Sequence, residues 1–540
     1  MKAFQENVSI QMMDEEDKEM ELKLELKVDQ VIEEYVGSLG FSQVLHVFLV
    51  SIAWIFDAQN TLVTIFTDAK PPAWSNAGAG GEVSSVCGLP AGSWTWIGGK
   101  ESSVISEWDL VCDRKFLAAA PASLFFFGSV LGAAFYGWIG DAVLGRKKTV
   151  LLSCILTSIT TFLTSISPNI WVYALLRFAS GFVRCGIGIC CLVLATEAVG
   201  RKWRGQVGQY GFFLFTVGFL TLPLIAYPYR TCWRKIYRVI SILPLVYSLL
   251  IIPFVSESPR WLAVKGRNKE ALDVLGRYAR LNGKKLPPNL SLSEPSFGGT
   301  GGQAKTSIWS TKWATSRMIL VMIAGFGVGC VYYGIQLNVE NLNFNLYISV
   351  MINALMEIPA MAIGTILLSY TNRRPQLSWS AFIAGVSSII CIFLSRVLRK
   401  DRDKMKGSWT QLSTEVVGLM AASRAFDMLY IVCLELFPTH VRNFAVSLLR
   451  QSLMLGASVA PLLVAIGRVS PSLSFLSFGI LSICSGLLCL YLPETKDAPL
   501  YETLEQQEEE EKLTSHVKDS LDLEKYEDSQ NLMVASNVAE

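Results

Sequence analysis

The strongest constraint on the fold is a series of twelve apolar stretches, each long enough to form a helix that crosses a bilayer, which takes about 20 mostly apolar residues. The stretches cover residues 44–66, 116–140, 149–167, 170–195, 207–227, 236–255, 317–338, 345–370, 377–397, 411–434, 444–467 and 473–492. A hydrophilic stretch at 256–316 separates the first six from the last six. This pattern predicts an all-α membrane protein with twelve transmembrane helices in two six-helix bundles related by internal duplication.

The composition supports a polytopic membrane protein. Hydrophobic residues make up 51% of the chain and charged residues 17%, whereas soluble globular chains carry about 25% charged residues. This balance excludes an ordinary cytosolic enzyme and a nucleic-acid binder with a basic face. The chain has only three His, and we find no phosphate-binding loop, nucleophile triad or metal-ligand spacing. We therefore expect no enzyme activity, no cofactor and no metal.

The net charge of +2 is the sum of large opposite contributions. Residues 1–40 carry −7 and residues 501–540 carry −9, which leaves +18 for residues 41–500. The acidic start lacks the basic and early apolar regions of a signal peptide. Both ends are therefore predicted to be hydrated tails, and their charge makes them candidate partners of the basic central loop.

An even number of spans places both tails on one side, and the distribution of Lys and Arg favours the cytoplasm. The predicted organisation is an acidic cytoplasmic segment 1–40, a six-helix bundle 41–255 with an extracytoplasmic loop at 67–115, a central cytoplasmic loop 256–316, a second bundle 317–495 and an acidic cytoplasmic tail 496–540. Lys265 to Leu281 is expected to form an amphipathic helix within the central loop.

Two cysteines stand apart from the rest. Cys87 and Cys112 lie in the long polar loop, whereas Cys185, Cys190 and Cys330 are examples that lie in apolar stretches. If the loop faces an oxidising compartment, we predict a disulfide between Cys87 and Cys112. The alternative is two free thiols.

The loop after the second apolar stretch combines tight turns with opposite charges. It runs from Gly137 to Lys148 and contains Asp141, Gly145 and Arg146. Such a loop can bring two helix ends together and form a charge lock that opens and closes as the two halves rock. The alternative is that the basic cluster only reflects the topology of the chain.

This loop resembles the conserved loop of the major facilitator superfamily, with one extra residue before Gly145. The segment beginning Arg177-Phe-Ala-Ser resembles the buried Arg motif of the same superfamily. The second-half loop keeps Arg373 but has Ser369 and Asn372 where the superfamily usually has Asp and Gly. Acidic and Arg residues that follow other spans complete the expected gate, and they are Glu197, Glu257, Arg260, Glu435 and Arg442.

The segment from Ser106 to Arg114 is the most specific motif. Together with Glu-Ser-Pro-Arg-Trp-Leu at 257–262, it resembles the organic cation, anion and carnitine transporters. The single short loop at 67–115 is similar to that of the plant organic cation/carnitine transporters. The resemblance implies secondary-active transport of an organic cation or a zwitterion such as carnitine, by alternating access, with a proton or sodium ion as the coupling ion. Relatives divide between plasma and vacuolar membranes, of which we favour the plasma membrane.

Ionisable residues inside apolar spans are candidates for the substrate site, because each costs about 2.5–3.5 kcal/mol on insertion scales. Glu357 is the strongest, since it lies midway along its span and resembles the site carboxylate of the family. It could attract a cation or bind a proton, or it could be a structural partner of Arg450 or Arg424. Asp57 and Arg184 are expected to form a structural ion pair.

Aromatic and amide side chains accompany this carboxylate. Tyr332, Tyr333 and Gln336 lie in the seventh span, and aromatic faces bind quaternary ammonium groups. Phe212 in the fifth span is a further candidate, although packing explains such residues equally well.

The eleventh span departs from the family pattern. Members often carry an ionised residue at the position that Met454 occupies, while Arg450 lies one turn earlier. Arg450 would repel a simple cation but could bind the carboxylate of a zwitterion. The alternatives to this carrier are a non-transporting membrane nutrient receptor on the same fold, and a sugar or organic anion carrier.

Overall fold

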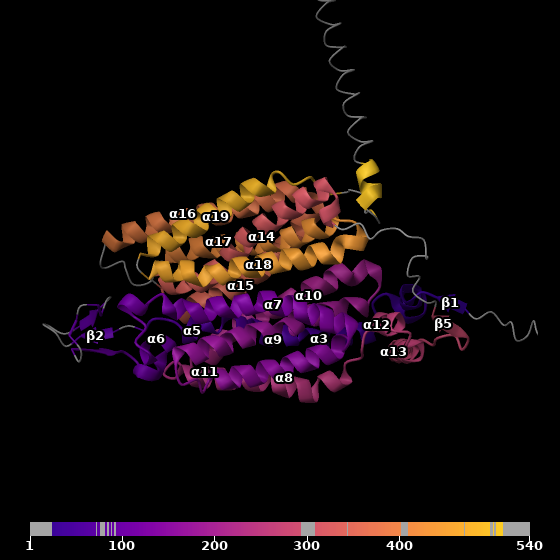
Figure 1. The fold of residues 1–540 in the computed structure, drawn as a ribbon, viewed down its shortest axis with the longest axis horizontal. Helices are drawn as coiled ribbons and strands as arrows, with labels where there is room; N and C mark the ends of the chain where they lie inside the picture. Colours follow the sequence, from indigo (N-terminus) through magenta and orange to yellow (C-terminus); the bar gives the residue numbers. More distant parts are fainter. Residues whose placement is uncertain are drawn as a thin grey trace, which may run out of the picture.

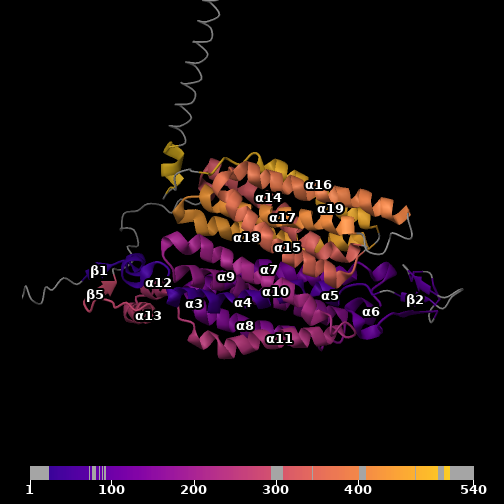
Figure 2. The ribbon, with the colours of Figure 1, turned by 180° about the vertical axis from the view of Figure 1, so that it is seen from behind.

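The computed structural model of the 540-residue chain describes residues 24–292, 308–400, 409–496, 501 and 504–510, apart from short gaps within 72–92 and at positions 343 and 469. The long helices lie side by side in two layers, the N-terminal helices in one and the C-terminal helices in the other (Figure 1). The view from behind shows the same division (Figure 2).

The N-terminal layer begins with a first span in three consecutive pieces and continues with five longer helices. These elements are α3 (Phe41–Ser51), α4 (Ala53–Leu62), α5 (Thr64–Thr67), α7 (Ala120–Ala142), α8 (Arg146–Thr164), α9 (Ile170–Glu197), α10 (Arg204–Ala226) and α11 (Trp233–Leu250). The C-terminal layer consists of α14 (Lys312–Leu337), α15 (Leu346–Tyr370), α16 (Arg373–Lys400), α17 (Trp409–Leu436), α18 (Thr439–Gly467) and α19 (Pro471–Cys489).

Eleven helical segments of the described chain are long and apolar enough to span a membrane. The twelfth long helix, α8, starts with three basic residues and is rich in Ser and Thr, which lowers its hydropathy. It still packs against α9 and α11 as part of the N-terminal layer. The all-α fold with twelve long helices, predicted from the apolar stretches, is confirmed.

Glycines let some helix backbones come close together. A Cβ atom on Gly132 of α7 would collide with the carbonyl of Phe182 in α9, and one on Gly456 of α18 would collide with the carbonyl of Phe326 in α14. Because glycine has no Cβ, these helices pack backbone against backbone in both layers.

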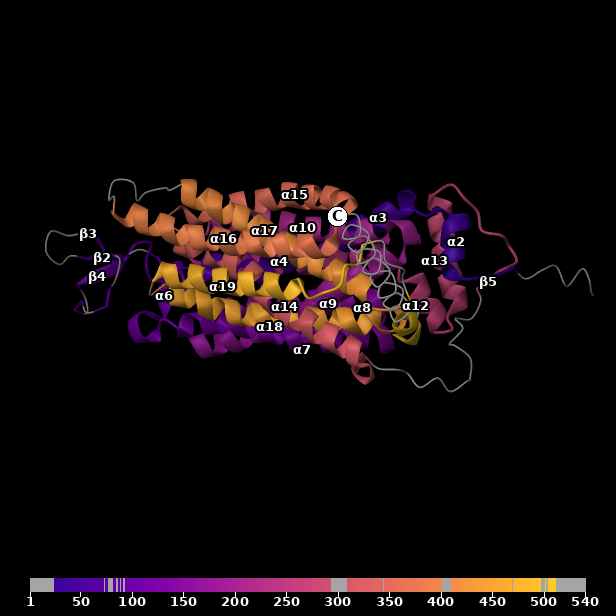
Figure 3. The ribbon, with the colours of Figure 1, turned by 90° about the horizontal axis from the view of Figure 1, so that it is seen from above.

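The two ends of the molecule differ (Figure 3). One end, here called the sheet end, carries the antiparallel strands β2 (Ala73–Ser75), β3 (Gly81–Val83) and β4 (Trp94–Trp96). The opposite end, here called the tail end, carries β1 (Leu24–Leu26), β5 (Leu290–Leu292) and the helical residues 504–510.

The loop at the sheet end is held by a disulfide and by hydrogen bonds to α11. Cys87 and Cys112 form a disulfide with their Cα atoms 5.6 Å apart. Glu107 accepts hydrogen bonds from the Trp233 indole, at 2.6 Å, and from Arg234 of α11. The segment that resembles the transporter family in sequence therefore anchors this loop to α11.

At the tail end, part of the acidic N-terminal segment is not the hydrated tail that its composition predicted. Leu24–Leu26 pairs in parallel with β5, and α2 (Val28–Val31) and the π-helix Ile32–Gly37 follow directly. Val31, Ile32 and Val36 are buried against α12 (Pro259–Val264) and α13 (Asn268–Leu281) of the central loop. The apolar residues between the acidic ones explain this packing. Residues 1–23 and 511–540 lie outside the described part.

Asp29 holds this segment against the bundle. Its carboxylate lies 2.7 Å from Arg260, 3.0 Å from Arg204 and 3.1 Å from Arg201. Burial alone would raise the pKa of this carboxyl, but Arg260 and Arg204 hold the pKa of Asp29 below its ordinary value.

The substitution Asp29→Asn should loosen the segment. A carboxyl with a lowered pKa stabilises the folded state above its ordinary pKa of about 3.9, and this stabilisation is lost as the pH falls through the folded-state pKa. We expect a loss of about 2 kcal/mol of local stability at pH 7, seen as faster deuterium exchange of residues 24–37. The difference from wild type should shrink below about pH 4. Glu34→Gln, at an exposed position of the same segment, is the control and should change nothing. Equal exchange in Asp29→Asn and wild type at pH 7 would contradict the role of Asp29.

Candidate functional site

Glu357 of α15 is buried where the two layers meet. Its Oε1 accepts hydrogen bonds from the Tyr332 hydroxyl at 3.2 Å and the Gln336 amide at 3.1 Å, both from α14. Its Oε2 accepts one at 3.1 Å from the hydroxyl of Thr216, which belongs to α10 in the other layer. The structure thus brings three of the predicted site residues together and adds Thr216, which the sequence reading missed because a single Thr in an apolar span is unremarkable.

Aromatic rings surround this carboxylate cluster. Tyr332 packs against Phe426 of α17 with ring centroids 4.9 Å apart, and against Tyr333 at 5.1 Å. Tyr333 reaches the other layer, where its ring lies 4.8 Å from that of Phe126 on α7. Phe426 was not among the predicted residues. A carboxylate beside several aromatic faces suits a cationic ammonium group.

Phe212, the remaining aromatic candidate, packs its ring against the first span. The ring of Phe212 packs against Trp54 of α4 at 5.6 Å. Its contribution to the cluster is its backbone carbonyl, which accepts a hydrogen bond from the Thr216 hydroxyl at 3.3 Å. Phe212 therefore lies one turn before Thr216 on α10, with its ring against α4.

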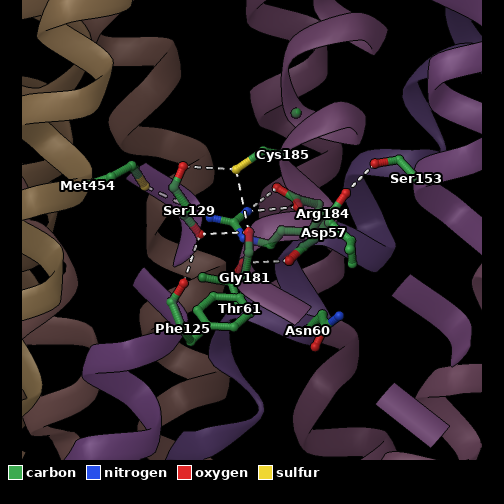
Figure 4. Close-up of polar contacts among 12 residues, drawn as sticks. Asp57, Asn60, Thr61, Phe125, Ser129, Ser153, Gly181, Arg184, Cys185 and Met454 are labelled. Atoms are coloured by element: carbon green, nitrogen blue, oxygen red, sulfur yellow. Dashed lines mark hydrogen bonds and ion pairs between the residues drawn. The ribbon is translucent and has the colours of Figure 1, made fainter. Parts of the chain in front are cut away.

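Asp57 of α4 and Arg184 of α9 form the ion pair expected from the sequence, in the interior of the N-terminal layer. Nη1 of Arg184 donates to both carboxylate oxygens, at 2.7 and 2.8 Å (Figure 4). Both side chains are buried, and the Arg184 guanidinium also lies over the ring of Phe125. The sulfur of Met454 in α18 lies 3.9 Å from Nη2 of Arg184 (Figure 4). Met454 therefore touches this pair from the opposite layer.

Three further charged side chains of the spans have partners other than Glu357. Arg450 of α18 donates to the carbonyl of Gly188 in α9 at 3.4 Å, across the layers. Arg424 and Asp427 pair with each other within α17 at 3.3 Å. Among the residues that the structure describes, Glu357 has no ion pair. The alternative that it is the structural partner of Arg450 or Arg424 therefore has no support.

The predicted first-half gate residues gather at the tail end. Arg146, at the start of α8, lies 2.9 Å from Asp141 and 3.4 Å from Glu197 at the end of α9. Glu257 accepts hydrogen bonds from the backbone N–H groups of Arg146 at 3.0 Å and Lys147 at 3.1 Å. A carboxylate at a helix N-terminus is stabilised by the unpaired N–H groups and the helix dipole.

Gly145 makes this arrangement possible. Its φ of 84° lies in the left-handed region, and a Cβ atom there would be 2.6 Å from a carboxylate oxygen of Glu257. The turn thus needs glycine both for its backbone conformation and for space beside Glu257.

Three other predicted gate residues have hydrogen-bond or ion-pair partners outside this lock. Arg260 pairs with Asp29, as described above, and donates to the carbonyl of Val199 at 3.3 Å. Arg177 is fully buried within the N-terminal layer, where it donates to the backbone and side chain of Asn60 at 3.1 Å. Arg442 donates to the nearby carbonyl of Phe437 at 3.2 Å.

The C-terminal half repeats the lock although its sequence departs from the family pattern. Arg373, at the start of α16, lies 3.4 Å from Glu435 at the end of α17. Glu494 accepts from the backbone N–H groups of Arg373 at 2.8 Å and Arg374 at 3.2 Å. Arg373, Glu435 and Glu494 thus correspond to Arg146, Glu197 and Glu257. Glu494 was missed, although its place after the last span of its half parallels that of Glu257.

At the sheet end the two layers meet through side chains of both halves. Arg468, after α18, pairs with Glu340 at 2.8 Å and donates to the carbonyl of Asp68 at 3.1 Å. The ring of Tyr347 stacks on Phe66 at 5.1 Å and contacts Tyr227 at 5.4 Å. The ion pairs described above for the tail end, by contrast, each join residues of one half.

Comparisons with known proteins identify the family of this chain. A family model described as sugar (and other) transporter matches residues 98–506. Organic cation/carnitine transporter 2 of Arabidopsis thaliana is 41% identical over 502 residues, which cover 89% of this chain and 94% of that protein. Solute carrier family 22 member 3 of Mus musculus is 32% identical over 417 residues, which cover 77% of this chain and 73% of that protein.

The fold also matches solved structures. An inward open conformation of the xylose transporter XylE from E. coli superposes with a TM-score of 0.61 at 14% identity, covering 84% of this chain and 97% of that chain. This likeness shows the fold, and the sequence relatives show the branch. The chain belongs to the sugar (and other) transporter family of the major facilitator superfamily, and within it to the organic cation, anion and carnitine transporters, where it resembles the plant organic cation/carnitine transporters.

Proposed function

We propose that this protein carries small organic cations or zwitterions, carnitine among them, across a membrane by alternating access. One observation carries the proposal. Glu357 is a buried carboxylate without an ion-pair partner among the described residues, hydrogen-bonded from both layers and bordered by Tyr332, Tyr333 and Phe426. The names of the relatives point to the same class of substrate.

The charge locks at Arg146 and Arg373 hold each half of the carrier together as a unit. In each half an Arg side chain pairs with a carboxylate at another helix end, Arg146 with Glu197 and Arg373 with Glu435. A further carboxylate, Glu257 or Glu494, caps the helix that begins at this Arg. The halves can therefore rock as rigid units about the contacts near Glu357. We place the tail end in the cytoplasm, the sheet end outside it, and the protein in the plasma membrane.

Counterflow in proteoliposomes tests this function. Vesicles preloaded with unlabelled tetraethylammonium or carnitine should take up the labelled compound faster than empty vesicles, because exchange needs no coupling ion. Saturable binding without counterflow would instead support a nutrient sensor. Counterflow of a sugar or an organic anion alone would support the other carrier classes. Fluorescent fusion protein at internal membranes rather than the cell surface would overturn the assigned membrane.

Arg450→Gln should separate zwitterions from simple cations. The guanidinium of Arg450 lies at the contact between the layers and is the group that could bind a substrate carboxylate. Losing such a charge-assisted pair costs about 1.5–3 kcal/mol, so carnitine uptake should fall about tenfold or more. Tetraethylammonium has no carboxylate, and its uptake should be unchanged or higher. An equal effect on both compounds would contradict the assignment of Arg450 to the substrate carboxylate.

A further inference from the structure

A buried polar face runs along α15 toward the substrate carboxylate. Ser349, Asn353 and Glu357 follow one another at intervals of four residues and are exposed by only 0%, 0% and 2%. Residues spaced by four lie on the same face of a helix, about 6 Å apart along its axis. The face therefore leads from near the start of α15 to the proposed substrate site.

A second carboxylate joins this face from the neighbouring helix. Glu415 of α17 is 4% exposed, and its Oε1 accepts a hydrogen bond of 3.1 Å from the amide of Asn353. Three further polar atoms of this cluster are buried without a hydrogen-bond partner, namely Oε2 of Glu415, Oδ1 of Asn353 and Oγ of Ser349. Glu415 was not predicted from the sequence, because it lies near the start of an apolar stretch.

No cation balances Glu415 in the described part of the chain. Of the helices packed against α17, α16 brings Cys391, whose thiol donates to the Gln411 carbonyl one turn before Glu415, and α15 brings Glu357, one turn beyond Asn353. Tyr332 of α14 packs on Phe426, about three turns further along α17. The Arg side chains of α18 bind elsewhere, Arg450 at the Gly188 carbonyl and Arg442 at the Phe437 carbonyl. None of the described ion pairs includes Glu415. An ionised carboxylate in such surroundings is unfavourable, whereas a protonated one has an O–H group that the open acceptors can take.

The chemistry favours a proton over a metal ion. The cluster has a single carboxylate, one amide and one hydroxyl, and the described residues contain no group of three or more His, Cys, Asp or Glu that could hold a metal. A proton needs only one carboxylate oxygen and one acceptor.

We propose that Glu415 is the coupling site of this carrier, a carboxyl that binds one proton from water on one side and releases it on the other side during each cycle. Binding adds H+ to Oε2 and makes the side chain neutral, and release restores the carboxylate. Asn353 links this site to Glu357 along the polar face of α15. The inference rests on the proposed transport function and adds to it a proton site distinct from the substrate carboxylate.

Glu415→Gln tests the inference, because glutamine keeps the shape of the side chain and cannot bind the proton. With one proton per cycle, a gradient of one pH unit can change substrate accumulation by up to tenfold, the equivalent of about 1.4 kcal/mol. Reconstituted wild type should accumulate labelled tetraethylammonium differently under opposite pH gradients. Glu415→Gln should lose this response and keep exchange without a gradient. Glu270→Gln, in an exposed pair on α13, is the matched control.

The outcomes separate the two proposals. Absence of exchange in wild type would overturn the transport function itself. Normal exchange with an unchanged pH response in Glu415→Gln would overturn only the proton site, as would a wild type driven by a sodium gradient and indifferent to pH. If Glu415→Gln does not reach the membrane, Glu415→Asp and Asn353→Ala replace it. The first should keep the pH response, and the second should shift the pH midpoint of gradient-driven accumulation. An unshifted midpoint in Asn353→Ala would overturn the inference.

Discussion

Replacing Glu357 by Gln should reduce uptake of labelled tetraethylammonium by about 30-fold or more. Two unit charges about 4 Å apart interact with about 4 kcal/mol at the effective dielectric constant of about 20 that applies even to buried sites, and half of that after desolvation is already a factor of about 30. The same variant should fold at least as well as wild type. Glutamine occupies the same volume, and the hydroxyls of Tyr332 and Thr216 can rotate to meet it.

The measurement is initial-rate uptake in proteoliposomes, together with thermal unfolding in detergent. Thr216→Val is the graded comparison, because it removes one hydrogen bond from Oε2 and leaves the charge in place. Its loss should be about tenfold, the lower limit of the range of about 1.5–3 kcal/mol for a hydrogen bond to a charged group, because Oε1 keeps both of its hydrogen bonds. Uptake of the cation by Glu357→Gln at the wild-type rate would refute Glu357 as the site carboxylate.

Much of the architecture could be predicted because membrane insertion imposes a simple rule on sequence. A helix must bury about 20 apolar residues, and this alone locates the spans. Even α8, with its basic start and many hydroxyl side chains, was recognisable as a span between its neighbours. Outside the spans this rule does not apply, and there the composition led to a wrong prediction. The acidic start of the chain looked like a solvated tail, but Val31, Ile32 and Val36 pack on the central loop.

The site was harder to predict, because it depends on how helices far apart in sequence are rotated against one another. Glu357 could be proposed from its place in the span and from family resemblance, and Tyr332 and Gln336 from their side-chain chemistry, but the donor Thr216 comes from the opposite layer. Glu415 was overlooked because acidic residues near the end of a span usually reach water. Its burial follows from the packing of α15 and α16 around α17.

The largest loss of stability should come from removing one member of the Asp57–Arg184 pair. Breaking a buried ion pair leaves an uncompensated charge, which costs about 3–5 kcal/mol. Asp57→Asn should therefore lower the midpoint of thermal unfolding in detergent sharply, since Arg184 has both its shortest hydrogen bonds to this carboxylate. Arg450 is the comparison, because Arg450→Gln removes a cation at the layer contact whose described hydrogen bond goes to a carbonyl, and it should cost much less.

A double variant distinguishes a structural role of the Asp57–Arg184 pair from a role in transport. Replacing both residues by apolar side chains, as in Asp57→Leu with Arg184→Met, leaves no unpaired charge, so stability should recover to near the wild-type value. If the pair is structural, exchange of tetraethylammonium recovers with it, because Glu357, Tyr332 and Thr216 are untouched. If the double variant is stable and does not transport, the two charges take part in the transport cycle. The contact of Met454 with Arg184 across the layers is then the next contact to test. If the double variant lost as much stability as Asp57→Leu and Arg184→Met together, the two charges would act independently, contrary to the short contacts of Arg184 Nη1 with both carboxylate oxygens.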